Sequence, residues 1–230
     1  MKNKIWIEPS ILSGDFGALG SEAKRLELAG ADAIHVDIMD GLFVPNLTLG
    51  ARAVGAINRA TDLFLDVHLM IYNPYDHIAE FVKMGADRIT FHLEATEDVE
   101  GTIEAIRRCG VEVGLAIKPG TAVELLLPYL GLCDLILIMT VNPGFGGQEF
   151  LPDMVEKIKD LSDIYERLLL EGKIDKKVRL QVDGGINCET GRACVKSGAD
   201  TIVSGSHLFN AADMAQSIKN LRAACEGGRG

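Results

Sequence analysis

The chain has 230 residues, of which 47% are hydrophobic, and a formal net charge of −10. This length and apolar content predict a large core in a single domain spanning residues 1–230. The acidic charge argues against a nucleic acid or an acidic membrane as partner, and no apolar run is long enough to predict a spanning helix. The chain starts without a signal-peptide pattern, and its five cysteines form no Cys-x-x-Cys pair, so we expect reduced thiols and a cytoplasmic protein.

Apolar, β-prone runs alternate with amphipathic helical patterns along the whole chain. The runs predict strands at residues 5–12, 33–39, 63–68, 88–92, 112–117, 135–140, 178–182 and 201–204. The helical patterns lie between them, at residues 17–29, 51–59, 75–84, 99–109, 122–129, 154–170, 189–196 and 212–225. A Gly-Ala-Asp sequence recurs at residues 30–32, 85–87 and 198–200, each time after a predicted helix, which is typical of a short return loop to a sheet.

Eight strand–helix units without a linker predict a (β/α)8 TIM barrel. Several strands are almost continuous apolar runs, as a parallel sheet covered on both faces requires. A doubly wound open sheet is the alternative. In a barrel, the residues that carry function gather at the carboxyl ends of the strands.

Polar and sulfur-containing side chains concentrate at those strand ends. His35, Asp37 and Met39 share one face of their strand because side chains alternate, and His68 and Met70 share a face of the next. Met139 and Asp183 end two later strands. A His-x-Asp pair on one face can hold a metal ion, although a buried His–Asp hydrogen bond is the alternative for that pair alone.

Glycine-rich loops follow three successive strands at the same end, at residues 144–148, 183–187 and 204–206. Backbone amides without obstructing side chains, together with a helix N-terminus, can bind phosphate. The last two loops of a barrel are its usual phosphate position. The alternative is that these glycines only permit tight turns.

Several stretches together identify a family resemblance over nearly the whole chain. They are residues 9–12 (PSIL), 35–46 (HVDIMDGLFVPN), 66–70 (DVHLM), 139–148 (MTVNPGFGGQ), 182–186 (VDGGI) and 204–206 (SGS). The chain resembles the ribulose-phosphate 3-epimerases, whose fold is a (β/α)8 barrel around one divalent metal ion, often zinc. The resemblance implies His35, Asp37, His68 and Asp183 as metal ligands.

The same resemblance implies a phosphoketose substrate, with D-ribulose 5-phosphate as the first choice, and we expect a homo-oligomer. The implied substrate-binding residues are Ser10, Met39, His68, Met70, Met139, Gly144, Phe145, Gly146, Gly147, Gly184, Gly185, Gly205 and Ser206. Two histidines and two carboxylates suit Zn²⁺, Fe²⁺, Mn²⁺ or Co²⁺, and ligand type alone does not choose among them.

Inversion of a carbon beside a ketone requires an acid and a base on opposite faces of the substrate. Asp37 and Asp183 are the candidates, because they end strands in roughly opposite sectors of an eight-stranded barrel. A cation would stabilise the enediolate as a Lewis acid, and the methionines would shield it from water.

Other functions and residues fit less well. The sequences around residues 206–210 and 46–49 resemble the related D-allulose-6-phosphate 3-epimerase, which remains the alternative. A phosphosugar decarboxylase would carry a lysine two residues after Asp37, where Met39 stands, and a non-catalytic binding barrel would lack an acid or a ligand.

Five further polar residues are given no part in the chemistry. We expect His92 to form a structural pair with Glu94, and Asp40 to brace the loop to Asn46. His77, on a helix, and His207, in a loop, are expected to be solvated. Lys118 ends a strand and could form a Schiff base, but the resembling family carries Asn or Lys there.

Overall fold

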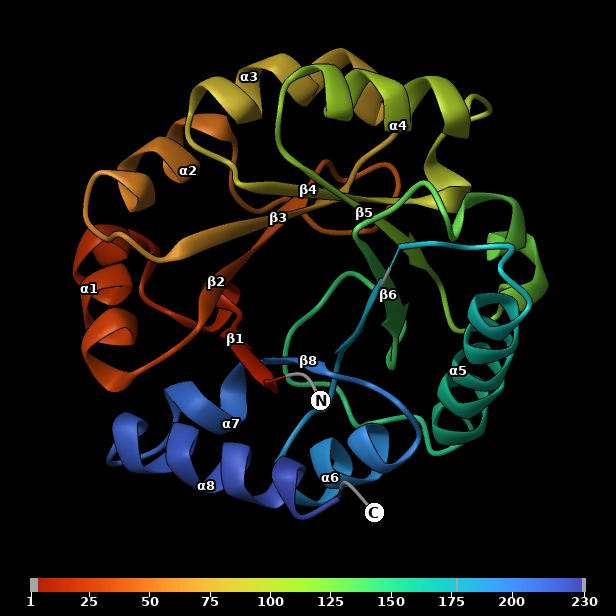
Figure 1. Cartoon of the computed structure of the whole chain (residues 1–230). Coiled ribbons are helices and arrows are strands. Elements are labelled where there is room, and N and C mark those ends of the chain that lie inside the picture. Colours follow the sequence, from red (N-terminus) through yellow and green to blue (C-terminus); the bar gives the residue numbers. More distant parts are fainter. Residues whose placement is uncertain (1–3, 177, 229–230) are drawn as a thin grey trace.

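Eight parallel strands form the centre of the molecule, with helices in a ring around them (Figure 1). The computed structural model describes residues 4–176 and 178–228, so both ends of the predicted domain lie outside the described residues. The strands are β1 (Trp6–Pro9), β2 (Ala33–Met39), β3 (Phe64–Met70), β4 (Arg88–His92), β5 (Glu112–Ile117), β6 (Leu135–Met139), β7 (Arg179–Asp183) and β8 (Thr201–Ser204).

The α-helices follow the strands in chain order. They are α1 (Leu19–Ala29), α2 (Ala51–Asn58), α3 (Ile78–Lys83), α4 (Val99–Arg108), α5 (Met154–Leu170), α6 (Cys188–Lys196), α7 (Ser206–Phe209) and α8 (Met214–Glu226). Short 3₁₀ helices are η1 (Ile11–Ser13), η2 (Phe16–Ala18), η3 (Pro74–His77), η4 (Leu93–Ala95) and η5 (Val123–Tyr129). None of the helices in the described part of the chain has the length and apolar character needed to cross a membrane.

The strand order β1-β8-β7-β6-β5-β4-β3-β2 brings the first two strands together at the seam of a nearly closed barrel. A parallel bridge between Ser10 and His35 joins them there. The predicted (β/α)8 barrel is therefore confirmed, and the doubly wound open sheet is wrong.

Several predicted elements differ from the observed ones, among them the following three. The first strand ends at Pro9 rather than at residue 12, since the chain turns into η1. The segment predicted as a helix at residues 122–129 is 3₁₀ rather than α, and it contains Pro128, which lacks the amide hydrogen of an α-helical bond. The helix predicted from residue 75 begins with the 3₁₀ turn η3 and continues as α3.

The recurring Gly-Ala-Asp sequence has a structural explanation. Gly30, with φ of 85°, ends α1 in the left-handed region that favours glycine. The aspartate of each repeat accepts a hydrogen bond from the backbone N–H of an adjacent strand: Asp32 from Ile7, Asp87 from Leu65 and Asp200 from Leu180. The repeat thus secures the return of each helix to the sheet.

Each strand divides its side chains between the helices and the barrel interior. Ile34, Val36 and Ile38 of β2 pack outward into the core beneath the helices. The register of β2 against β3 sets His35 beside Asp66 and Asp37 beside His68. Because this second set alternates with the outward one, its polar side chains point into the barrel.

Candidate active site

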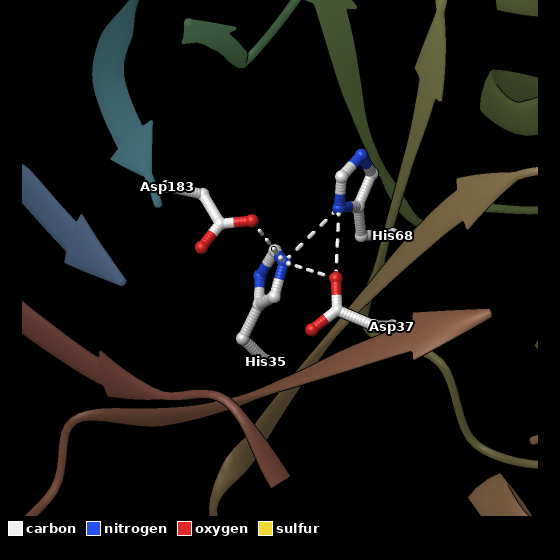
Figure 2. Close-up of side chains that lie close together, drawn as sticks. All are labelled: His35, Asp37, His68 and Asp183. Atoms are coloured by element: carbon white, nitrogen blue, oxygen red, sulfur yellow. Dashed lines mark hydrogen bonds and ion pairs between the residues drawn. The ribbon is translucent and has the colours of Figure 1, made fainter. Parts of the chain in front are cut away.

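Four side chains from three strands converge at the carboxyl ends of the strands (Figure 2). Nε2 of His35 lies 3.2 Å from Nδ1 of His68 and 3.3 Å from Oδ1 of Asp37. The same nitrogen lies 4.0 Å from Oδ2 of Asp183. Nδ1 of His68 lies 3.1 Å from Oδ1 of Asp37. Two imidazole nitrogens and two carboxylate oxygens therefore face one small volume.

The spacing of these atoms fits a shared cation. One nitrogen or oxygen atom from each of the four residues lies within 4.8 Å of all the others. Ligand atoms placed tetrahedrally at the usual zinc distances would be roughly 3.3 Å apart. Two imidazoles and two carboxylates are ligands for several divalent transition metals. The cluster can therefore hold one divalent ion without fixing which ion it is.

Neighbouring side chains turn two of these ligands toward the shared volume. Nδ1 of His35 lies 2.7 Å from Oδ2 of Asp66, a carboxylate that can only accept, so Nδ1 carries a hydrogen and Nε2 is the ring nitrogen available to a cation. Burial would raise the pKa of Asp66, but Arg88 and His35 hold it well below its ordinary value. The hydroxyl of Ser10 donates to Oδ2 of Asp37 at 2.6 Å, which leaves Oδ1 facing the histidines.

The electrostatics of the cluster favour a positive charge between the carboxylates. Burial would lower the pKa of His35, but the carboxylates of Asp37 and Asp66 raise it well above its ordinary value. Burial would raise the pKa of Asp37, but His35 and His68 hold it far below its usual range. Burial and the charge of Asp37 raise the pKa of Asp183 to about 6. A divalent cation would supply the charge that these carboxylates attract.

A cavity opens from Asp37 and Asp183 toward the loops at the carboxyl end. It is lined by twelve of the residues predicted to bind substrate: Ser10, Met39, Met70, Met139, Gly144, Phe145, Gly146, Gly147, Gly184, Gly185, Gly205 and Ser206. His68, also predicted, is fully buried and does not line the cavity. Lining residues that the sequence analysis did not assign to the site include Leu12 and Gln148, which lie within the quoted motifs, and Ser13, which adjoins one.

The three predicted methionines form apolar parts of the cavity wall. Met39 and Met70 pack with Phe43 and Val44 in one buried cluster. Met139 packs in a second buried cluster with side chains of β5 and β6. These thioethers contribute apolar surface next to the carboxylates without adding a competing charge.

Packing alone requires glycine at two of the loop positions. Gly184 has φ of 121°, and a Cβ there would lie 2.5 Å from a methyl group of Val141. Gly185 has φ of 66°, and its Cβ would lie 2.4 Å from the backbone nitrogen of Phe150. The tight-turn alternative therefore holds at these two positions, and the phosphate role of this loop stays a prediction. Gly205 and Ser206 lie at the start of α7, a one-turn helix that the sequence analysis did not predict.

A second polar layer fills the barrel below the cluster. Arg88 donates to Oδ1 of Asp66 at 2.9 Å and to both carboxylate oxygens of Glu8, at 2.9 and 3.1 Å. The Gln181 amide donates to Glu8 at 2.6 Å and to Asp66 at 2.8 Å. All four side chains are fully buried. The sequence analysis missed this layer, although strand alternation places the four residues on the inward face.

Asp40 braces the loop after β2, as its position predicts. Its Oδ1 accepts the backbone N–H groups of Leu42 and Phe43, and its Oδ2 accepts that of Tyr72. At the end of the loop, the Asn46 amide donates to the carbonyl of Gly144 at 2.7 Å. The loops after β2 and β6 are therefore connected over the cavity.

Lys118, His77 and His207 are not part of the cation cluster. His92 contacts Glu94, as predicted, but it also contacts His68. The Lys118 ammonium lies 3.7 Å from the centre of the Phe43 ring. His77 is exposed, as predicted. The prediction for His207 is wrong: it lies half-buried in α7, with Nε2 3.7 Å from Sγ of Cys188.

A larger hollow of about 550 Å³ lies between α5 and α6, next to the start of β7. Four of the charged side chains along it form ion pairs, Lys159 with Asp163 and Arg179 with Asp200. It lies at the amino ends of the strands, where conserved structure in barrels serves stability rather than catalysis. The site therefore belongs at the opposite end.

Comparisons with known proteins identify the family of the chain. The model of the ribulose-phosphate 3 epimerase family matches residues 6–209. A ribulose-phosphate 3-epimerase of Chlamydia muridarum is 47% identical over 208 residues, which are 90% of this chain and 90% of that protein. The ribulose-phosphate 3-epimerase of Bacillus subtilis is 43% identical over 218 residues, 95% of this chain and 98% of that one.

Solved structures add a likeness in fold alone. KGPDC from Streptococcus mutans is 12% identical with a TM-score of 0.71, covering 98% of this chain and 99% of that one. The 3-hexulose-6-phosphate synthase of Salmonella typhimurium is 15% identical with a TM-score of 0.66, covering 98% and 100%. The family match and the relatives, taken with the barrel and its site, show that the chain belongs to the ribulose-phosphate 3-epimerase family.

Proposed function

We propose that this enzyme interconverts D-ribulose 5-phosphate and D-xylulose 5-phosphate with Asp37 and Asp183 as its two proton-transfer groups. The observation that carries the proposal is that both carboxylates line one cavity at the carboxyl end of the barrel. The relatives named above are ribulose-phosphate 3-epimerases, which supports the pentulose substrate over D-allulose 6-phosphate. As a member of that family, the chain is an isomerase acting on carbohydrates.

The substrate phosphate is proposed to bind at the glycine loops after β6, β7 and β8. Gly144 to Gly147, Gly184, Gly185, Gly205 and Ser206 line the side of the cavity that these loops form. Backbone N–H groups in such loops can approach an anion closely, and the first turn of a helix leaves N–H groups free to donate. The net charge of −10 makes such local donors necessary, since the overall field does not attract an anion.

Proton transfer follows from the placement of the two aspartates. One carboxylate removes the proton from C3, the electrons move onto the oxygen at C2 as an enediolate, and the other carboxyl group returns a proton to the opposite face. Ser10, which donates to Asp37, holds that carboxylate in place. Met39, Met70 and Met139 exclude water from the planar intermediate.

A divalent ion held by His35, Asp37, His68 and Asp183 would supply Lewis-acid stabilisation of the charge that develops on the substrate oxygens. Zinc is our first choice, with iron, manganese and cobalt as alternatives. We also propose a single domain, a homo-oligomeric assembly and a cytoplasmic location.

Assays on two sugars and in deuterated water test this function. We expect kcat/KM for ribulose 5-phosphate to exceed that for allulose 6-phosphate at least about tenfold, since one extra carbon changes pocket contacts by about 1–3 kcal/mol. In D₂O, deuterium should enter C3 of unlabelled substrate. A ratio below one would assign the chain to the hexulose enzymes, and binding without exchange would make it a non-catalytic phosphosugar-binding barrel.

A further inference from the structure

Three side chains form a line that starts at the cation cluster and ends outside it. Nε2 of His68 lies 3.0 Å from Nε2 of His92, on the neighbouring strand β4. Nδ1 of His92 lies 3.3 Å from Oε2 of Glu94, in η4. Both imidazoles are fully buried. Neither His92 nor Glu94 lines the cavity or belongs to the cation cluster.

Glu94 is held as an ionised acceptor at the far end of this line. Its Oε1 accepts the backbone N–H of Lys118 at 2.8 Å and the hydroxyl of Thr121. Burial would raise the pKa of Glu94, but hydrogen bonds from His92, Thr121 and Lys118 lower it to about 2. A carboxylate in this state offers only lone pairs, so the group facing its Oε2 must donate.

The direction of each hydrogen bond then follows by elimination. Nδ1 of His92 must carry a hydrogen to donate to Glu94, and a second hydrogen on this buried ring would add an imidazolium near Lys118 and a bound cation. Nε2 of His92 is therefore an acceptor. With a cation in the cluster, Nε2 of His68 must donate to Nε2 of His92, which leaves Nδ1 of His68 with a lone pair for that cation, beside His35 and Oδ1 of Asp37.

We propose that Glu94 and His92 are positioning residues that hold His68 in the tautomer whose Nδ1 can ligate the cation. The inference rests on the proposed function, because it takes the four-residue cluster as the metal site. Asp66 acts on His35 directly, whereas Glu94 acts on His68 through one intervening ring. The ring of Phe43 packs 4.9 Å from the centre of the His92 ring and limits its reorientation.

Replacement of the Glu94 carboxylate by an amide tests the direction of the hydrogen bonds from His68 through His92 to Glu94. In Glu94→Gln, if the remaining oxygen keeps its bonds to Lys118 and Thr121, an NH₂ group faces Nδ1 of His92. His92 would then carry its hydrogen on Nε2, and His68 would carry one on Nδ1, where the cation must bind. His92→Phe keeps a buried ring but removes the acceptor, so it releases His68 without forcing the wrong tautomer.

The readout is metal affinity, measured by competition between the full-length protein and a chromogenic chelator for Zn²⁺. We expect Glu94→Gln to weaken Zn²⁺ binding about 10–100-fold, and His92→Phe to weaken it less. The visible spectrum of the Co²⁺-loaded Glu94→Gln protein should also change. Thr121→Val is the matched control, because it removes another partner of Glu94 but leaves the His92 contact, and we expect its Zn²⁺ affinity to stay within about twofold.

The outcomes separate this inference from the proposed function. Unchanged Zn²⁺ affinity and Co²⁺ spectrum in Glu94→Gln would overturn the inference, provided that the wild-type chain binds one ion. A larger loss in His92→Phe than in Glu94→Gln would also overturn it, since that order indicates ring packing alone. A wild-type chain that binds Zn²⁺ but does not turn over ribulose 5-phosphate would contradict the proposed function and leave the positioning result standing.

Discussion

The barrel interior contains two polar layers of similar composition that differ in how their charge is balanced. The lower layer contains Glu8 and Asp66, and the Arg88 guanidinium lies between them. The upper layer contains Asp37 and Asp183 with two histidines and no guanidinium or ammonium group. A buried carboxylate is costly unless it is paired, so the two layers must meet this cost differently.

The difference separates a structural network from a binding site. In the lower layer, Arg88, Gln181 and Thr90 donate hydrogen bonds to the carboxylates of Glu8 and Asp66. The three donor side chains are fully buried. In the upper layer, Asp183 is 17% exposed and lines the cavity. A layer that is filled by a fixed guanidinium supports the fold, whereas a layer without one that opens to a cavity can take a metal ion and a substrate.

Removal of either upper carboxylate should have the largest effect. We expect Asp37→Asn and Asp183→Asn each to lower epimerisation by about 10²–10⁴-fold, because each removes a proton-transfer group. Both also remove a ligand, so metal content and turnover must be measured on the same samples. More than a few per cent of wild-type activity in either variant would contradict the two-aspartate mechanism.

Removal of the cation should have a comparable but reversible effect. Dialysis against a strong chelator should abolish turnover, and one equivalent of a divalent ion per chain should restore it, since the four ligands form one site. Elemental analysis of the purified protein reports the metal content. Full activity with less than about a tenth of an equivalent of metal per chain would contradict the metal requirement. His35 and His68 would then serve only as hydrogen-bonding residues.

Removal of the internal cation of the lower layer should instead affect stability. Arg88→Met leaves Glu8 and Asp66 as buried carboxylates without their guanidinium partner, which should lower the free energy of unfolding by about 3–5 kcal/mol in urea titrations. Lys159→Met is the control, because it breaks only the exposed pair with Asp163 and should change stability little. Equal effects of the two substitutions would contradict the role assigned to the lower layer.

The sequence predicts the barrel and the convergence of the upper-layer side chains, because both depend on local patterns. The alternation His35-x-Asp37 puts two side chains on one face, and parallel strands bring their carboxyl ends together. The return loops were also readable, since glycine after a helix followed by aspartate recurs in the chain. These features need no knowledge of the register between strands.

The contacts of the lower layer, and those from His68 through His92 to Glu94, depend instead on strand register and join residues far apart in the sequence. Gln181 donates to Glu8 across 173 positions of the chain, a contact that no local pattern encodes. The pairing of His92 with Glu94 was expected, because the two residues are neighbours in sequence, but its connection to His68 requires the register of β3 with β4. The one-turn helix α7 was missed because four residues are too few to show a helical period.

The smallest predicted effect is a pH dependence of stability at His92, which contacts His68 of the upper layer. Burial lowers the pKa of His92 to about 4; the charge of His68 adds to this effect and Glu94 opposes it. An unfolded histidine titrates near 6.5. Between these values the unfolded chain binds a proton that the folded chain does not, so stability falls as the pH drops from 6.5 toward 4. This contribution reaches about 3 kcal/mol at the lower end of the window.

A comparison of wild type with His92→Phe isolates this contribution from the other titrating groups. Urea titrations of both proteins at several pH values between 4 and 6.5, with chelator present, remove the competition between metal and protons. The variant should lose less stability than the wild type as the pH falls, since phenylalanine takes up no proton in the unfolded chain. Parallel losses in the two proteins would mean that His92 is protonated in the folded state over this range, and would contradict the lowered pKa.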